Sequence, residues 1–237
     1  MPFSSELHIT ASDVDMFERL RMSSLFRYLQ EISIAHSDML GTGREEVQRF
    51  GAVWVLSRIR VQVERMPEHG QDVTLETWTG ETHHAVFPRY YRMLSSDGTV
   101  CLQASSIWLL MHTDTRRMIL PSTVGFQVPS TQLQPGLTLP GALAMPDFSR
   151  LAERTVQYSE IDLNGHVNNT RYLDWIDDLL EPMFHQFHPW NAMQINYINE
   201  MRPNEKSALH YNLSENSLAV LGTREGQKCF EAIGLFD

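Results

Sequence analysis

The sequence predicts an α+β protein in which one unit, a long helix wrapped by an antiparallel sheet, occurs twice in tandem. Two observations lead to this prediction. The same order of signals appears in both parts of the chain: an extended stretch, a helical pattern and then several strands. Short segments of the two parts also align in sequence, and a stretch rich in proline and glycine separates them.

Composition narrows the class of protein. The chain has 237 residues, 42% of them hydrophobic and 20% charged, which is enough to bury a substantial core. A formal net charge of -10 argues against nucleic-acid binding, which depends on clustered lysine and arginine. The sequence shows neither the roughly 20-residue apolar run of a membrane helix nor a secretory signal. Cys101 and Cys229 give no disulfide framework, so we expect a cytoplasmic protein without membrane insertion.

Prolines mark the boundary between the two parts. Residues 128–150 contain four prolines and two glycines and lack sustained periodicity. Prolines at this density disfavour both helix and central strand, which predicts a linker that crosses the surface. We therefore expect an N-terminal unit over residues 1–128, a linker over 129–150 and a C-terminal unit over 151–237.

The elements of the N-terminal unit follow in order. An extended stretch over residues 6–12 leads to an acidic turn and then to a helical pattern that starts near Ser23 or Ser24 and stops at Gly41. Apolar residues recur on one face of this pattern. Alternation and turn residues then predict strands over 53–64, 72–82, 86–95 and 99–111.

The C-terminal unit repeats this order. A second helical pattern runs from Tyr172 to Met183, with Asn168, Asn169 or Thr170 as its cap and Pro182 near its end. Helices of about 18 residues would be about 27 Å long. Strands are predicted over 192–201, 206–213, 217–223 and 228–236.

Alignment of the two units indicates a duplicated ancestral unit. Residues 13–15 match residues 160–162, and residues 64–67 lie over residues 200–203. Two such units could join their sheets edge to edge and so cover exposed strand edges. Internal pairing of this kind is compatible with a monomer or a homodimer.

Polar side chains cluster ahead of the second helix. Asp162, Asn164 and His166 stand at alternate positions, with Gly165 before the histidine. Unpaired backbone N–H groups and the helix dipole at such a place favour negative charge, as acyl transfer requires for the oxygen of its tetrahedral intermediate. We expect the amides near residues 167 and 168 to be these donors.

Each of these residues also has a structural interpretation. Asn164-Gly165 is a common turn dipeptide, Asp162 could cap the helix, and a single histidine in a loop is usually solvated. The combination favours a site, because a cap does not need Asp, Asn and His at alternate positions. Glu200, in the strand predicted over 192–201, has the pattern of a solvent-facing carboxylate, and periodicity does not bring it near His166.

The segment over residues 162–172, with residues 195–200 downstream, resembles the acyl-acyl carrier protein (acyl-ACP) thioesterases of bacteria and plants. The N-terminal part resembles the same family over residues 51–56, 65–67, 106–108 and 115–117. The resemblance implies a double-hotdog hydrolase that releases fatty acids from acyl carrier protein (ACP). It also implies that the catalytic residues are Asp162, Asn164, His166 and Glu200.

The residue after Glu200 restricts the mechanism. Some members of the family have cysteine there, whereas this chain has Met201, which cannot form a thiolate. We hypothesise that Glu200 attacks the thioester carbonyl or activates a water. His166 and Asn164 would position the reacting groups, and Asp162 would orient Asn164 or the loop.

The N-terminal unit lacks most of this set. Phe17 and Arg19 align with Asn164 and His166, and only a carboxylate at Glu64 remains. We expect this unit to do no chemistry and to hold the acyl chain, as the family resemblance implies.

The acidic ACP would need a basic patch on this acidic chain. The candidates are Arg58, Arg60, Arg65, Arg89, Arg92, Arg116 and Arg117. Histidine spacing indicates no metal site, and neither a phosphate loop nor a nucleophile elbow is present, so we expect no metal and no cofactor. Three alternatives remain: an acyl-CoA thioesterase centred on Asp162, a hotdog dehydratase, whose His-Phe-Pro signature is absent, and a non-catalytic acyl-binding protein.

Overall fold

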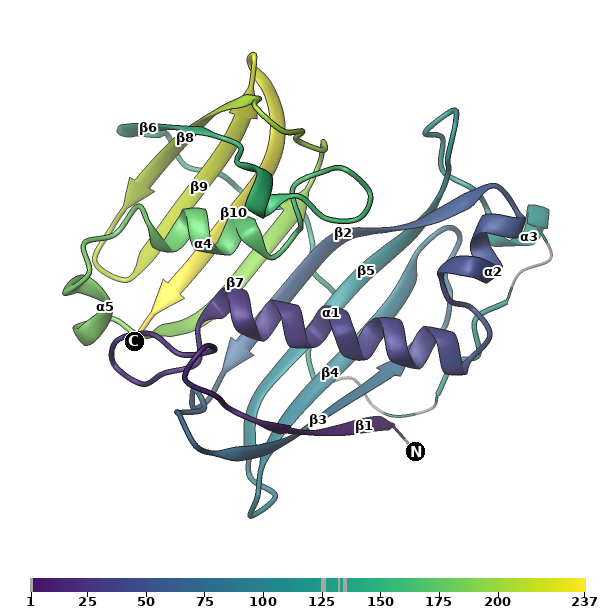
Figure 1. Ribbon diagram of the computed structural model, residues 1–237, viewed down its shortest axis with the longest axis horizontal. Helices are drawn as coiled ribbons and strands as arrows, with labels where there is room; N and C mark the ends of the chain where they lie inside the picture. The colour runs from purple at the N-terminus through teal and green to yellow at the C-terminus, as the bar shows by residue number, and fades with distance from the viewer. Residues whose placement is uncertain (1, 125–126, 132, 134–135) are drawn as a thin grey trace.

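A computed structural model describes residues 2–124, 127–131, 133 and 136–237 (Figure 1). The described residues form one ten-stranded antiparallel sheet in the order β1-β3-β4-β5-β2-β7-β10-β9-β8-β6. The strands are β1 (Phe3–His8), β2 (Ala52–Val63), β3 (Asp72–Thr79), β4 (Phe87–Ser95), β5 (Val100–His112), β6 (Arg150–Thr155), β7 (Trp190–Tyr197), β8 (Lys206–Leu213), β9 (Ser217–Arg224) and β10 (Gln227–Phe236). The helices are α1 (Met22–Met39), α2 (Arg44–Arg49), α3 (Pro121–Val124), α4 (Arg171–Asp177) and α5 (Phe184–Phe187), with a 3-10 turn over Tyr158–Glu160. The predicted α+β class is confirmed.

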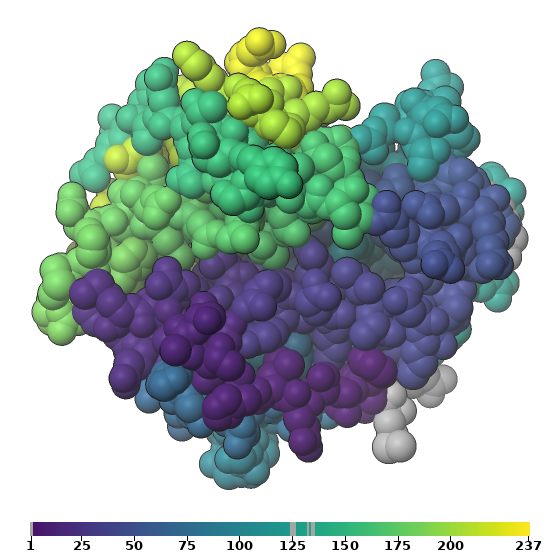
Figure 2. Space-filling model, in the orientation of Figure 1, coloured from purple at the N-terminus to yellow at the C-terminus, as the bar shows by residue number. Residues whose placement is uncertain are grey.

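The two parts of the chain meet edge to edge, as expected. β2 pairs antiparallel with β7, and this pairing joins the sheet of β1 to β5 to the sheet of β6 to β10. α1 and α4 contact each other on one face of the joined sheet (Figures 1 and 2). Neither sheet therefore leaves its β2 or β7 edge open to pairing with another chain.

Helix α1 forms where its apolar period predicts. Leu25, Leu29 and Ile32 are buried against the sheet, while Ile34 faces solvent. The helix stops before Gly41, whose φ of +66° is a left-handed conformation that glycine adopts at low cost. The expected serine cap is wrong: Arg21 is the N-cap, and both serines are buried in the first turn.

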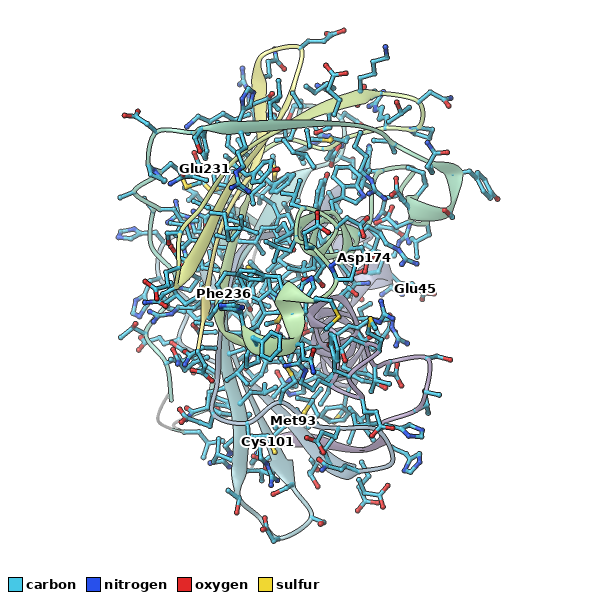
Figure 3. All side chains as sticks on the ribbon, turned by 90° about the vertical axis from the view of Figure 1, so that its left-hand side faces the viewer. Glu45, Met93, Cys101, Asp174, Glu231 and Phe236 are labelled. Atoms are coloured by element: carbon cyan, nitrogen blue, oxygen red, sulfur yellow. The ribbon has the colours of Figure 1, made fainter. Side chains whose placement is uncertain are left out.

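The second helix is shorter than the pattern from Tyr172 to Met183 predicts. α4 covers only 7 residues, and the amides of Leu179 and Leu180 then bond to the third preceding carbonyl. Pro182 lacks an N–H and disfavours helical geometry in the residue before it, so the helix tightens and ends. A separate short helix, α5, follows it. Near it lies Phe236, the last residue of β10, which Figure 3 labels. Its ring stacks on Trp190 and meets Phe184 edge-on.

Backbone hydrogen bonds repeat between the two parts. Ile9 N–H donates to Gln71 O at 2.9 Å, and Val156 N–H donates to Glu205 O at 2.9 Å. Likewise Leu20 N–H donates to Pro67 O at 2.8 Å, and Val167 N–H donates to Met201 O at 2.9 Å. Pro67 therefore stands where Met201 stands, and Met66 stands where Glu200 stands. The sequence alignment of Glu64 with Glu200 is wrong by two residues, because it matched prolines rather than hydrogen-bonded positions.

Described residues of the linker, Thr138 and Gly141, contact the face of the sheet opposite α1. Ser105 Oγ donates to Thr138 O at 2.8 Å, and Gln194 Nε2 donates to Gly141 O at 2.8 Å. Side chains alternate along a strand, and Ser106, next to Ser105, faces Tyr91 and α1. The described residues from 129 to 149 form neither helix nor strand. Pro135, one of the four linker prolines, lies outside the described residues.

Candidate active site

Asp162 organises the loop ahead of α4. Its Oδ1 accepts the N–H of Asn164 at 2.8 Å and the N–H of His166 at 3.4 Å, and its own N–H donates to His166 O at 2.8 Å. Gly165 has a φ of +80°, which closes the turn without a Cβ penalty. Asn164 Nδ2 also lies 3.3 Å from Asp162 Oδ2. The loop therefore holds Asn164 and His166 in fixed positions, as a side chain capping its own turn does.

Glu200 reaches this loop from the other side. His166 Nε2 lies 3.0 Å from Glu200 Oε2, with the histidine side chain 16% exposed and the glutamate 42% exposed. β7 ends at Tyr197, so the strand predicted over 192–201 is too long at its end. Glu200 stands in the loop that follows, next to the fully buried Met201.

Met201 determines where Glu200 sits. Its carbonyl accepts the N–H of Val167, the residue after His166. His166 precedes Val167 and Glu200 precedes Met201 in the chain. The bond between Val167 and Met201, together with the buried Met201 side chain, therefore brings His166 and Glu200 into contact. The pairing of His166 with Glu200 follows from this non-local bond, which no local sequence pattern encodes.

The expected oxyanion donors are wrong. The N–H of Val167 donates to Met201 O, and the N–H of Asn168 donates to Glu160 O at 2.9 Å. Both amides already have backbone acceptors, because the segment between His166 and α4 is hydrogen-bonded to the chain on each side. A donor for a substrate oxygen can instead come from a side chain, such as the exposed amide of Asn164.

Sequence reasoning missed Arg116 as a member of this site. Its guanidinium Nη2 donates to Glu200 Oε2, although it comes from the turn after β5 in the N-terminal part of the chain. The sequence pointed to Arg116 only as one of seven basic candidates and as part of the resemblance over residues 115–117. The backbone carbonyl of Glu200 in turn accepts Nη1 of Arg224 at 3.1 Å, and Arg224 also pairs with Glu205.

Beneath the loop, Glu160 is a buried, ionised anchor. It accepts the N–H of Gln157 at 2.7 Å, Arg154 Nη2 at 2.7 Å and Trp175 Nε1 at 2.8 Å. Burial alone would raise the pKa of Glu160, but these three donors outweigh it and lower the pKa below its usual value. Because Glu160 O also holds the Asn168 amide, the anchor fixes the chain on both sides of the loop.

The N-terminal part contains the same loop without the same side chains. Asp15 Oδ1 accepts the N–H of Phe17 at 2.8 Å and of Arg19 at 3.0 Å, and its own N–H donates to Arg19 O at 2.8 Å. Phe17 and Arg19 thus stand where Asn164 and His166 stand, as the sequence predicts. Arg19 pairs with Asp15 at 3.5 Å and donates to a backbone carbonyl, and Met66 takes the place of Glu200. This loop has no His–Glu pair.

A small pocket lies where the two parts meet. It is lined mainly by apolar and aromatic side chains of α1, β2, β4 and β5 and by residues beside the candidate site, including Phe26, Leu29, Ile59, Tyr91, Asn169 and Tyr197. Tyr197 donates to Asn169 O at 3.0 Å, and burial raises the pKa of its phenol. The part of the chain that the structure describes holds no group of three His, Cys, Asp or Glu suited to a metal ion. None of its helices is long and apolar enough to cross a membrane.

The chain is similar to known proteins along most of its length. Residues 1–121 match the model of the acyl-ACP thioesterase N-terminal domain, and residues 146–231 match that of the C-terminal domain. A chloroplastic palmitoyl-acyl carrier protein thioesterase of Gossypium hirsutum is 25% identical over 218 residues, which cover 84% of this chain and 52% of the relative. The chain thus spans about half the length of the curated relatives it matches.

Solved structures share the whole fold. An acyl-ACP thioesterase from Bacteroides thetaiotaomicron superposes with a TM-score of 0.89 at 23% identity, covering 100% of this chain and 98% of that one. The 12:0-ACP thioesterase from Umbellularia californica gives a TM-score of 0.85 at 21% identity, covering 100% and 97%. These likenesses confirm the predicted hotdog fold. With both family models matching over most of its length, the chain belongs to the acyl-ACP thioesterase family.

Proposed function

We propose that the protein hydrolyses the thioester of fatty acyl-ACP, releasing a free fatty acid and so terminating fatty acid synthesis. The observation that carries the proposal is the contact between His166 and Glu200 at 3.0 Å, beside an asparagine held by Asp162. An acid–base pair next to an amide donor is what thioester hydrolysis requires. Membership of the family supports the substrate class.

Two routes use the same residues. In the first, Glu200 attacks the thioester carbonyl carbon, the C–S bond breaks, the carrier thiol leaves with a proton, and water hydrolyses the acyl-glutamate anhydride. In the second, Glu200 takes a proton from water as the water oxygen attacks that carbon, and the C–S bond then breaks to release the fatty acid and the carrier thiol. In both routes Asn164 Nδ2 donates to the developing oxyanion and His166 gives the leaving sulfur a proton that the attacking water replaces, while Asp162 holds the loop.

The two units of the chain have different functions in this proposal. The N-terminal unit, residues 1–128, holds the acyl chain, and the linker over 129–150 leads to the catalytic C-terminal unit, residues 151–237. The small pocket between α1 and the strands β2, β4 and β5 supports this division, because its lining is mainly apolar and includes Asn169, three residues after His166. The Asp15 loop supports it as well, because Phe17, Arg19 and Met66 stand there in place of the asparagine, histidine and glutamate of the candidate site.

ACP is the proposed partner, and its acidic surface selects among the basic candidates. Arg89 is 6% exposed and lies inside the fold, and Arg92 is paired with Glu76 at 2.6 Å. Neither is suited to dock a protein. Arg117 is exposed and lies in the same turn as Arg116, at the rim of the site, so we place the docking contact there. We also propose a cytoplasmic location, which the two buried free thiols support.

The test is hydrolysis of matched acyl-ACP and acyl-CoA substrates by the purified protein. Wild type is expected to favour acyl-ACP, and H166A is expected to lose about 10²–10⁴ in kcat. H69A is the matched control, since His69 is an exposed loop histidine in the N-terminal part. Preference for acyl-CoA, with loss in D162A but not in E200Q, would indicate an Asp162-centred thioesterase. Tight acyl binding without turnover would indicate a binding protein.

A further inference from the structure

Arg116 occupies an unusual backbone position. β5 ends at His112, and the chain reverses so that Arg116 N–H donates to His112 O at 3.0 Å and His112 N–H donates to Arg117 O at 2.8 Å. Arg116 has a φ of +55°, in the left-handed region. A side chain there costs about 1–2 kcal/mol, and glycine avoids that cost. The turn by itself therefore favours glycine, and the role of the arginine must lie in its side chain.

The side chain crosses from the N-terminal part of the chain to the candidate site. Its guanidinium binds Glu200 Oε2, the same oxygen that lies 3.0 Å from His166 Nε2. The other oxygen, Oε1, accepts no hydrogen bond from any residue that the structure describes. The carboxylate is thus held by one oxygen and open at the other. Both Arg116 and Glu200 are about two-fifths exposed, at 41% and 42%, so a substrate can reach the open oxygen.

We propose that Arg116 is a positioning residue for the reaction: it holds Glu200 through Oε2 and so presents Oε1 to the thioester carbon or to the attacking water. An ion pair of this kind restricts the direction of attack, and a misplacement of about 1 Å can cost about 10²-fold in rate. The proposal rests on the proposed function. It also makes the site composite, because the N-terminal unit supplies a group without which Glu200 is not oriented.

The test compares variants of Arg116 on acyl-ACP. R116G removes the side chain and suits the left-handed turn, so it separates loss of the contact from loss of the fold. We expect kcat to fall about 10–100-fold in R116G, with KM changed by less than about twofold. R116K is expected to recover part of the rate, and added guanidinium ion is expected to rescue R116G. R44A is the matched control, because Arg44 is an exposed cation at the start of α2, and it is expected to keep wild-type kcat.

A double variant shows whether Arg116 acts through Glu200. If it does, R116G in an E200Q background lowers kcat no further than E200Q alone. An additive loss would overturn the positioning role, and so would a rise in KM with unchanged kcat, which would assign Arg116 to carrier docking. Wild-type kcat in R116G would overturn the proposal while leaving the proposed function intact. Absence of turnover by wild type on either thioester would overturn both.

Discussion

The imidazole of His166 lies 3.0 Å from the carboxylate of Glu200, and these two residues come from loops that no local pattern connects. The loop of His166 is built on Asp162, and the loop of Glu200 is anchored by buried Met201. One backbone bond, from Val167 N–H to Met201 O, brings the loops together.

Replacing the carboxylate of Glu200 should abolish most of the activity. E200Q keeps the size of the side chain and one acceptor oxygen but can neither attack the thioester nor accept a proton from water. We expect kcat on acyl-ACP to fall about 10²–10⁴-fold. The control is E64Q, an exposed carboxylate at the end of β2 that the sequence aligned with Glu200. Equal losses in both variants would contradict the assignment.

Met201 should contribute to stability and to activity together. Its side chain is fully buried, and Met→Ala changes in cores cost about 2–5 kcal/mol in the free energy of unfolding. M201A should therefore unfold at lower urea concentration and also lose kcat, since the same residue places Glu200. M16A is the control, because Met16 is 69% exposed. Loss of stability with full kcat in M201A would show that Glu200 is positioned by other contacts.

The two equivalent turns should respond in opposite directions to substitution. Gly165 and Glu18 both have left-handed backbone, with φ of +80° and +65°. G165A should lower the free energy of unfolding by about 1 kcal/mol and reduce kcat, because it strains the turn that holds His166. E18G should be neutral or stabilising and keep kcat. Urea unfolding and steady-state assays measure both effects, and a stabilising G165A would contradict the structure.

Asp177 should make stability depend on pH. Burial raises the pKa of its carboxyl to about 7, with Asp174 and Asp178 nearby adding to the rise and the Trp190 hydrogen bond opposing it. The folded state therefore binds this proton more tightly than the unfolded state, whose pKa is about 4. Stability from this group is full below about pH 4 and is lost as pH rises through about 7.

The substitution D177N tests this dependence. An amide keeps an acceptor for Trp190 Nε1, which now lies 2.9 Å from Asp177 Oδ1, and it does not ionise. Compared with wild type, D177N should be more stable at pH 8, and the difference should shrink toward pH 4. Urea unfolding across this range measures the difference. A difference in the free energy of unfolding that does not change with pH would show that Asp177 is solvated in the folded protein.

Most elements of the N-terminal part could be predicted from the sequence. The alternation of apolar and polar residues in a strand, and the period of apolar residues in a helix, involve only residues close in sequence. The helix α1 and the strands β2 to β5 therefore lie close to their predicted positions. The order of these elements and the aligned segments also predicted the repeated unit. The Asp162, Asn164 and His166 cluster was visible for the same reason, because its three side chains lie within one turn.

The contacts between segments far apart in sequence are visible only in the tertiary structure. Glu200 meets His166 through the Val167–Met201 bond, and Arg116 reaches Glu200 from the N-terminal part of the chain. The amides of Val167 and Asn168 are used by the fold, which local reasoning about a helix N-terminus could not foresee. These relationships depend on hydrogen bonds and packing between segments far apart in sequence, whereas periodicity reports only which face of an element is buried.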